Sequence, residues 1–318
     1  MIKKSKKNKV ATGATLSSLH GPKGTGNALS RPRDKKTGKK TSYNVQPIVL
    51  KGRDLENLDS VLNFLNQLGI SVSAYKRGYL IRRTRARIGR LRLSSYKEYL
   101  AYLKVTPDEI KELEEALSIN VTRFFRNEDT YDFIRDSILP TLFGRNNSNK
   151  TSEVKIWSAG CAVGAEPYSL AILCRDKKYL NRKVNILATD INIELISIAQ
   201  NGVYSPHYLA EMTSRVATKY FSLDRDQNYK VKASIKRIVK FQRLDLTKDP
   251  YPKNYDIVVC RNVLIYIDSK MQQQIIENFY KTLKVGGILV LGRTETLRGK
   301  WKKKFIPVSP KHRVYRKV

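Results

Sequence analysis

The segment WSAGCAVGAEPYSL, from Trp157 to Leu170, decides how the central part of this chain folds. Gly160 and Gly164 allow a sharp turn and a close approach of another group to the backbone. Pro167 suits the first turn of a helix, where its missing N–H is not needed. The segment predicts a strand over Val154–Ser158, then a glycine-rich turn and a helix, with a ligand held against the turn.

Short apolar runs of strand length continue after this turn and alternate with helical stretches. Such alternation predicts a parallel sheet with helices on both faces, the doubly wound α/β class. Ligands bind these sheets at the carboxyl ends of the strands. The expected strands are VKIWSA (154–159), VNILATD (184–190), RIVKFQRL (237–244), YDIVVC (255–260) and GILVLGR (287–293).

Two acidic residues indicate the kind of ligand. Asp190 ends the second run, where nucleotide-binding folds place an acid that accepts hydrogen bonds from ribose hydroxyls. It also suits the N-cap of a helix beginning near Ile193, and both roles are compatible. Glu166, beside the turn, would repel phosphate and attract a cation, and the turn has neither the full G-x-G-x-x-G pattern nor G-K-[ST]. Adenosine with a positive charge describes S-adenosylmethionine.

Composition limits the possible partners and the cellular compartment of this protein. The net charge of +33, from 61 Lys+Arg against 28 Asp+Glu, suits nucleic acid, an acidic membrane or an acidic protein, and charge alone does not choose. The three cysteines form no C-x-x-C pair, which favours a reducing compartment. The histidines lie far apart in the sequence, so we expect no metal. Without a secretory signal or an apolar run of about 20 residues, we expect a cytoplasmic protein that does not insert into membranes.

The chain divides by composition into successive parts. Residues 1–45 are basic and poor in large apolar residues, which predicts a disordered tail, either a tether to an acidic partner or a solvated segment. Residues 46–119 repeat apolar positions at helical spacing and predict a small all-α domain. A linker at 120–150 leads to the α/β domain at 151–318. The expected helices are Leu55–Gly69, Tyr79–Leu91, Ser94–Leu103 and Pro107–Leu117.

From about Asp54 to the C-terminus, the chain resembles the CheR family of chemotaxis receptor methyltransferases. The resemblance implies a Rossmann-like class I domain dependent on S-adenosylmethionine, with a small antiparallel β-subdomain inserted at about 204–237. It also implies methyl transfer to glutamate side chains of chemoreceptors, which forms methyl esters for sensory adaptation and leaves S-adenosylhomocysteine. Its motifs are SINVTRFFRN from Ser118, SAGCAVGAEPYSLA from Ser158, ATDINIELISIAQNGVY from Ala188, YDIVVCRNVLIYID from Tyr255 and LKVGGILVLGRTETL from Leu283.

The resemblance implies cofactor contacts on several segments. Of three departures from the family pattern, two are that Ala165 stands where the family usually has a second glutamate, and that GRTETL replaces a Gly-His-Ser-Glu pattern. Asp245 falls where Asn is more frequent, but a carboxylate still accepts a hydrogen bond from the adenine amino group. The cofactor-binding residues expected from the turn and the resemblance are Asn120, Thr122, Arg126, Gly160, Glu166, Asp190, Asp245, Leu246, Arg261 and Asn262.

The chemistry that the resemblance implies needs few acid–base groups. A glutamate with a pKa of about 4.3 is already ionised at neutral pH and needs no general base to attack a methyl group. We expect Arg126 to orient this carboxylate and Tyr266 to shape the acceptor pocket. The alternatives are a surface arginine at a helix start for Arg126 and core packing for Tyr266.

A basic helix offers a docking surface. In YLIRRTRARIGRLRL, we expect Arg82, Arg83, Arg87 and Arg90 to gather on one face, opposite the apolar residues. This face suits the acidic methylation helices of chemoreceptors, and its alternative is a generic solvated face. We expect a monomer.

Two other classes of function stay open. A nucleic-acid methyltransferase would use the positive charge, but the sequence has no [DNS]-P-P-[YFW] tetrad and no cysteine pair of the cytosine C5 type, so we expect no nucleic-acid partner. A noncatalytic protein that binds S-adenosylmethionine as a signal is disfavoured by the presence of Arg126, Glu166 and Asp190.

Overall fold

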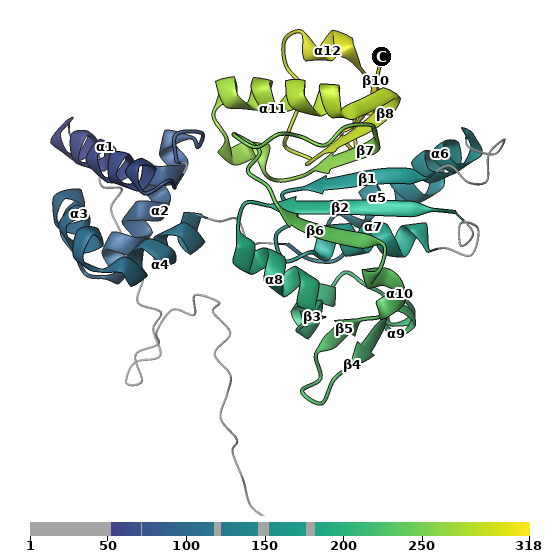
Figure 1. Ribbon diagram of the computed structural model, residues 1–318, viewed down its shortest axis with the longest axis horizontal. Helices are drawn as coiled ribbons and strands as arrows, with labels where there is room; N and C mark the ends of the chain where they lie inside the picture. Colours follow the sequence, from purple (N-terminus) through teal and green to yellow (C-terminus); the bar gives the residue numbers. More distant parts are fainter. Residues whose placement is uncertain (1–51, 71, 118–121, 146–152, 176–181) are drawn as a thin grey trace, which may run out of the picture. The chain divides into compact units, whose positions relative to one another are not determined.

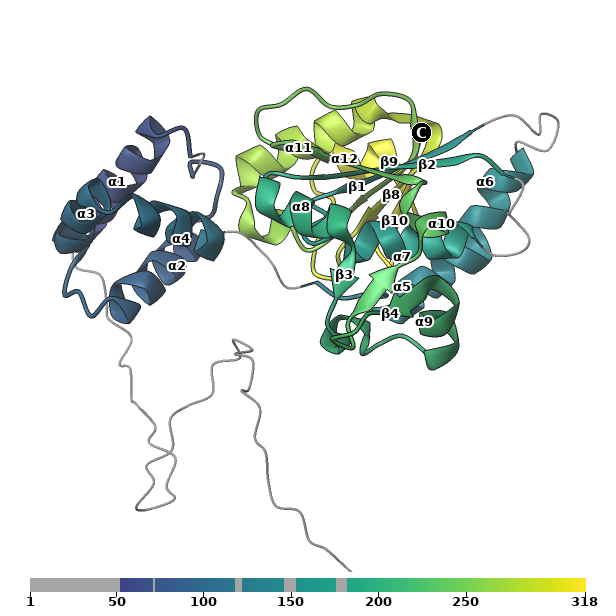
Figure 2. The same ribbon diagram turned by 60° about the horizontal axis from the view of Figure 1, so that its bottom comes forward.

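The structure is a computed structural model that describes residues 52–70, 72–117, 122–145, 153–175 and 182–318. The expected tail at 1–45 and the expected cofactor contact Asn120 lie outside these residues. The 150/151 boundary between linker and α/β domain also falls outside them. Figures 1 and 2 show the elements from two directions.

The first described part is the expected all-α domain. Leu58, Val61 and Leu65 recur at three- and four-residue spacing and are fully buried, so they form the inner face of the first helix. The third helix begins after Ser95, whose side-chain oxygen accepts a hydrogen bond from the Glu98 N–H over 3.2 Å. The helices are α1 (Gly52–Gln67), α2 (Arg77–Arg90), α3 (Tyr96–Val105) and α4 (Pro107–Leu117).

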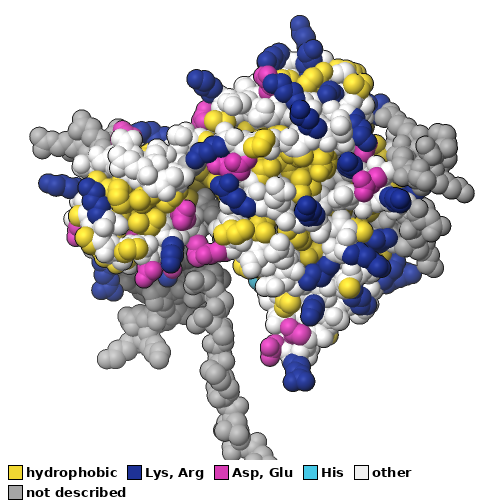
Figure 3. All heavy atoms as spheres, viewed as in Figure 1, with side chains coloured by type: hydrophobic (Ala, Val, Ile, Leu, Met, Phe, Trp, Pro, Cys, Tyr) yellow, Lys and Arg dark blue, Asp and Glu magenta, His cyan; other side chains and the backbone are white. Residues whose placement is uncertain are grey.

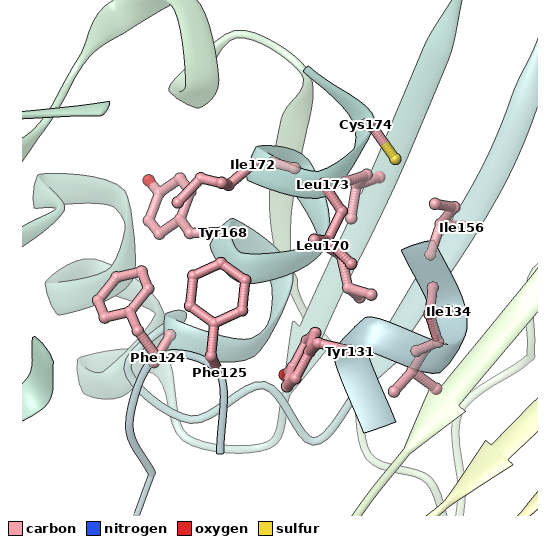
Figure 4. Close-up of a cluster of buried hydrophobic side chains, with 14 of the residues drawn as sticks. Phe124, Phe125, Tyr131, Ile134, Ile156, Tyr168, Leu170, Ile172, Leu173 and Cys174 are labelled. Atoms are coloured by element: carbon pink, nitrogen blue, oxygen red, sulfur yellow. The ribbon is translucent and has the colours of Figure 1, made fainter. Parts of the chain in front are cut away.

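The segment at 122–145 packs onto the α/β domain through aromatic and aliphatic side chains. The ring of Phe124 meets that of Tyr204 edge-on at 5.0 Å. Tyr131 and Ile134 are buried in the same cluster as Ile156 of the first strand, and Figure 4 shows them beside it. The segment forms α5 (Glu128–Phe133), the π-helix η1 (Ile134–Ile138) and α6 (Leu139–Arg145).

A seven-stranded sheet in the order β6-β2-β1-β7-β8-β10-β9 forms the centre of the α/β domain. The pairs β6–β2, β2–β1, β1–β7 and β7–β8 are parallel, as the sequence predicts. The sheet is nevertheless mixed, because β10 pairs antiparallel with both β8 and β9. Only residues 310–313 separate β9 from β10, and so short a connection joins antiparallel strands. The strands are β1 (Val154–Ala159), β2 (Val184–Asp190), β6 (Val239–Arg243), β7 (Tyr255–Cys260), β8 (Leu283–Leu291), β9 (Phe305–Ser309) and β10 (Val314–Lys317).

Alternate strand residues pack into two cores, one on each face of the sheet. In β7, Ile257 and Val259 join the cluster that holds α7 (Ala165–Cys174), while Val258 and Cys260 join the cluster that holds α11 (Ser269–Thr282). Figure 1 shows α11 on one side of the sheet and α7 and α8 (Ile193–Asn201) on the other. This is the expected doubly wound arrangement.

A small three-stranded antiparallel sheet, in the order β3-β5-β4, follows α8. It confirms the expected inserted subdomain, and Figure 2 shows it beside α9. No helix among the described residues is both long and apolar enough to cross a membrane. The subdomain contains β3 (Val203–Tyr204), η3 (Pro206–Leu209), α9 (Ser214–Tyr220), β4 (Phe221–Leu223), β5 (Tyr229–Val231) and α10 (Ala233–Lys236).

Candidate functional site

The glycine turn after β1 is tightly packed. Gly160 and Gly164 have φ of +79° and +88°, a region that favours glycine. A Cβ at Gly160 would lie 2.5 Å from Cγ2 of Val263, which belongs to the loop after β7. Any larger residue would therefore push this loop away from the turn.

Asp190 ties the end of β2 to the glycine turn. Its Oδ2 accepts a hydrogen bond from the Ala162 N–H over 2.8 Å, and its Oδ1 accepts one from the Asn192 N–H over 3.1 Å. Asn192, rather than Asp190, is the N-cap of α8, because its Oδ1 accepts from the Glu194 N–H over 2.8 Å. Burial raises the pKa of Asp190, and the backbone hydrogen bonds oppose that rise.

Glu166 lies at the start of α7 and is buried. Its Oε1 accepts a hydrogen bond from the Ser158 hydroxyl over 2.9 Å, and its Oε2 lies 3.7 Å from Nη1 of Arg261. Burial raises the pKa of this carboxyl, while the Arg261 charge acts in the opposite direction. A cationic ligand group beside Glu166 would favour its ionised form.

Arg261, which directly follows β7, forms hydrogen bonds with the linker. Its Nη2 donates to the main-chain oxygen of Arg126 over 2.8 Å and to Oδ1 of Asn127 over 2.9 Å. The linker is bent at this point, because Phe125 and Asn127 have φ of 53° and 64°. The guanidinium also lies 5.4 Å from the ring centre of Tyr131. These contacts hold the backbone at Arg126 and on its C-terminal side.

Asp245 follows β6 and is almost fully buried. Its Oδ1 accepts hydrogen bonds from the N–H and the hydroxyl of Thr247 over 2.8 and 2.7 Å. The Asp245 N–H donates to Oδ2 of Asp249 over 2.8 Å. The turn after β6 therefore holds the Asp245 carboxylate in a fixed position.

These segments line one pocket at the carboxyl ends of β1, β2, β6 and β7. The close backbone at Gly160 and the acids Glu166, Asp190 and Asp245 fit a ligand with an adenosine and a cationic part. Among the described residues, no group of His, Cys, Asp and Glu has the arrangement of a metal site. The structure brings to this pocket the expected residues Thr122, Arg126, Gly160, Glu166, Asp190, Asp245, Leu246, Arg261 and Asn262.

Tyr266 lies elsewhere in the described structure. It is not among the lining residues of this pocket, and its ring packs 4.8 Å from that of Tyr79 in the all-α domain. Sequence reasoning missed Tyr75, Val263 and Ile267, which do line the pocket. Tyr75 stands before α2, in a short connection without periodic signal. Val263 and Ile267, however, belong to the quoted YDIVVCRNVLIYID motif.

The basic helix α2 differs from the expectation at one position. The prediction that Arg87 shares an exposed face with its neighbours is wrong, because its side chain is buried against α4. Its Nε donates to Oε1 of Glu109 over 2.9 Å, and its Nη1 lies 2.9 Å from Oε2 of Glu112. The guanidinium carbons of Arg82 and Arg83 lie 5.5 and 5.3 Å from the ring centre of Tyr79.

The comparisons with known proteins agree with this geometry. The CheR methyltransferase SAM binding domain matches residues 120–314, and the CheR methyltransferase all-alpha domain matches residues 57–118. A chemotaxis protein methyltransferase of Borreliella burgdorferi is 34% identical over 241 residues, covering 74% of this chain and 85% of that protein. One from Listeria innocua is 30% identical over 230 residues, covering 72% and 86%. The chain therefore belongs to the CheR methyltransferase family, whose catalytic domain binds S-adenosylmethionine.

Proposed function

We propose that this methyltransferase transfers the methyl group of S-adenosylmethionine to glutamate side chains of chemoreceptors, forming glutamyl methyl esters. One observation carries the proposal. The pocket combines three carboxylates suited to an adenosine and a cation with the linker residue Arg126, and no His or Lys is among its described lining residues. Such a pocket suits an acceptor that is already ionised at neutral pH and needs no general base.

The cofactor, when bound, supplies an electrophilic methyl group on a sulfonium. In the proposed arrangement, Asp190 accepts hydrogen bonds from the ribose hydroxyls, and Asp245 accepts one from the adenine amino group. Glu166, buried and balanced by Arg261, attracts the cationic end. Thr122, Leu246 and Asn262 complete the wall.

Positioning of the acceptor is the main catalytic task in this proposal. Arg126 presents its guanidinium fork to the incoming carboxylate, while the Arg261 contacts hold the backbone beside it. Holding the two reactants in a near-attack geometry supplies up to about 7–11 kcal/mol in model reactions. Tyr266 does not reach the pocket wall. We therefore propose that it acts through its contact with Tyr79, by supporting the acceptor side.

The receptor is proposed to dock on α2 through Arg82, Arg83 and Arg90. Arg82 and Arg90 are exposed, and the Tyr79 ring that lies against Arg82 and Arg83 also touches Tyr266 of the loop after β7. This continuity would place an acidic helix close to the pocket. The cysteines at 161, 174 and 260 are free and buried, which supports a reducing, cytoplasmic setting.

The test is transfer of labelled methyl groups to receptor-containing membranes and, in parallel, to RNA. We expect label on the receptor that mild base releases, because methyl esters hydrolyse where methylated bases do not. Label on RNA, or base-stable label on protein, would contradict the proposal. Figure 3 shows Lys and Arg side chains spread over the catalytic domain rather than gathered in one patch, so nothing on this face singles out a nucleic-acid site.

A further inference from the structure

Glu295 is a buried carboxylate without an assigned role. It lies in the loop after β8 with only 4% of its surface exposed. Its Oε2 accepts hydrogen bonds from the Gly292 N–H over 2.6 Å and the Asn262 N–H over 3.1 Å. Its Oε1 accepts one from the Ile265 N–H over 3.3 Å. One side chain therefore satisfies backbone donors from two loops.

The backbone around Glu295 leaves little freedom for any other arrangement. A Cβ on Gly292 would lie 2.7 Å from the Glu295 Oε2 and 2.8 Å from the Asn262 nitrogen. Asn262 itself has a φ of 62°, which is unfavourable for a residue with a side chain and persists only when its surroundings hold it. The carboxylate and the glycine together stabilise this left-handed turn.

The loop that Glu295 holds forms part of the cofactor pocket. Asn262 and Val263 line the pocket, and Val263 occupies the space that a side chain on Gly160 would need. On the other side, Lys76 donates its main-chain N–H to the oxygen of Tyr266 over 2.8 Å and its Nζ to the oxygen of Ile265 over 2.7 Å. Contacts from the loop after β8 and from the all-α domain therefore hold the same short loop.

We propose that Glu295 is a positioning residue, which keeps the Asn262–Ile265 loop against the glycine turn and thereby sets the affinity for the cofactor. A charged carboxylate accepts from several N–H groups at once, and no neutral side chain of the same size does this. In Glu295→Gln, one of the two oxygens becomes an NH₂ group. That group faces backbone donors whichever way the amide is turned, so the loop loses at least one support.

The test is calorimetric titration of the full-length protein with S-adenosylhomocysteine. We expect Glu295→Gln to weaken binding by at least about tenfold, since small misplacements at a site have effects of this order. Glu277→Gln is the matched control, because Glu277 is a half-buried α11 residue that pairs with Lys281 and Lys300 and does not line the pocket. Its affinity should stay within about twofold of the parent.

Kinetics distinguish positioning from a general loss of folded protein. A smaller folded fraction lowers kcat and leaves the KM for S-adenosylmethionine unchanged, whereas a misplaced loop raises that KM. Gly292→Ala, which disturbs the same contact from the opposite side, should raise it too. Hydrogen exchange in the unmodified protein tests the proposal even if a variant does not fold. The Asn262 and Gly292 amides should exchange slowly there.

Several results would overturn the proposal. They are a folded Glu295→Gln protein with unchanged affinity for S-adenosylhomocysteine, free exchange of both amides, or no binding by the parent. Binding of S-adenosylhomocysteine involves no methyl acceptor. These binding results therefore do not depend on whether the acceptor is a receptor glutamate.

Discussion

Arg261 donates a hydrogen bond over 2.8 Å to the main-chain oxygen of Arg126, a residue 135 positions earlier in the chain. The bond joins the loop after β7 to the linker between the two domains. It engages the main chain of Arg126, so it places this residue at the pocket wall without occupying its guanidinium in that bond. The Arg261 side chain therefore supports both the cofactor pocket and the residue that we propose orients the acceptor.

Arg126→Ala should separate these two tasks. We expect S-adenosylhomocysteine affinity to change by less than about threefold and methyl transfer to fall by about a hundredfold or more, because the acceptor carboxylate loses its orienting fork. Calorimetry and a receptor methylation assay measure the two quantities. Arg135→Ala is the control, since Arg135 pairs with Asp132 and Asp136 in η1. Unchanged turnover in Arg126→Ala would refute the role.

Reversing charge on α2 should affect the receptor and leave the cofactor alone. For the double variant Arg82→Glu and Arg90→Glu, we expect the KM for receptor to rise by about fivefold or more, most strongly at low salt. Affinity for S-adenosylhomocysteine should not change. The same reversal at Lys302 and Lys303, both exposed in α12 (Trp301–Lys304), is the matched control. Equal effects from the two pairs would argue for bulk charge in place of docking.

Arg87 should matter for stability. Arg87→Met leaves the buried Glu109 carboxylate without its cation, which we expect to cost about 3–5 kcal/mol of unfolding free energy. Arg77→Ala removes an ion pair whose side chains are 47% and 50% exposed, and it should cost less than about 1 kcal/mol. Urea denaturation measures both variants. Similar losses would mean that burial does not decide the value of these pairs.

The buried Glu166 predicts a specific dependence of stability on pH. Burial raises its pKa in the folded state, so its contribution to stability is present below the unfolded pKa of about 4.3 and is lost as the pH rises through the folded value. Glu166→Gln does not titrate. Its unfolding free energy should therefore increase relative to the parent as the pH rises from the unfolded pKa through the folded one, while it binds S-adenosylmethionine more weakly.

The control for this titration is Glu277→Gln. Hydrogen bonds from Lys281 and Lys300, together with their charges, lower the pKa of Glu277, so this substitution should show the opposite trend with pH. Denaturation curves at several pH values measure both variants. A pH-independent difference for Glu166→Gln would show that its burial does not penalise the charged form.

Local patterns predicted the parts of this fold that depend on local chemistry. The glycine turn, the five parallel strands and the acid at Asp190 follow from residues close together in sequence. The strands β9 and β10 escaped prediction because Pro307 interrupts the short apolar run of β9, and Arg316 and Lys317 fill half of β10. Arg87 was misplaced because only the packing of α4 against α2 brings Glu109 to it. Sequence patterns included Glu295 only within the GRTETL motif, because its hydrogen-bond partners Asn262 and Ile265 lie in another loop.

The edge strand β9 of the main sheet affects how readily the protein can aggregate. Pro307 lies in this outermost strand opposite Tyr315, and its ring nitrogen offers no hydrogen to a passing chain. At the other edge of the sheet, β6 carries the exposed side chain of Lys240, and a charge on an edge strand disfavours pairing with a second copy. Neither edge strand pairs readily with a strand of another molecule. We therefore expect the protein to tolerate high concentrations without forming fibrils.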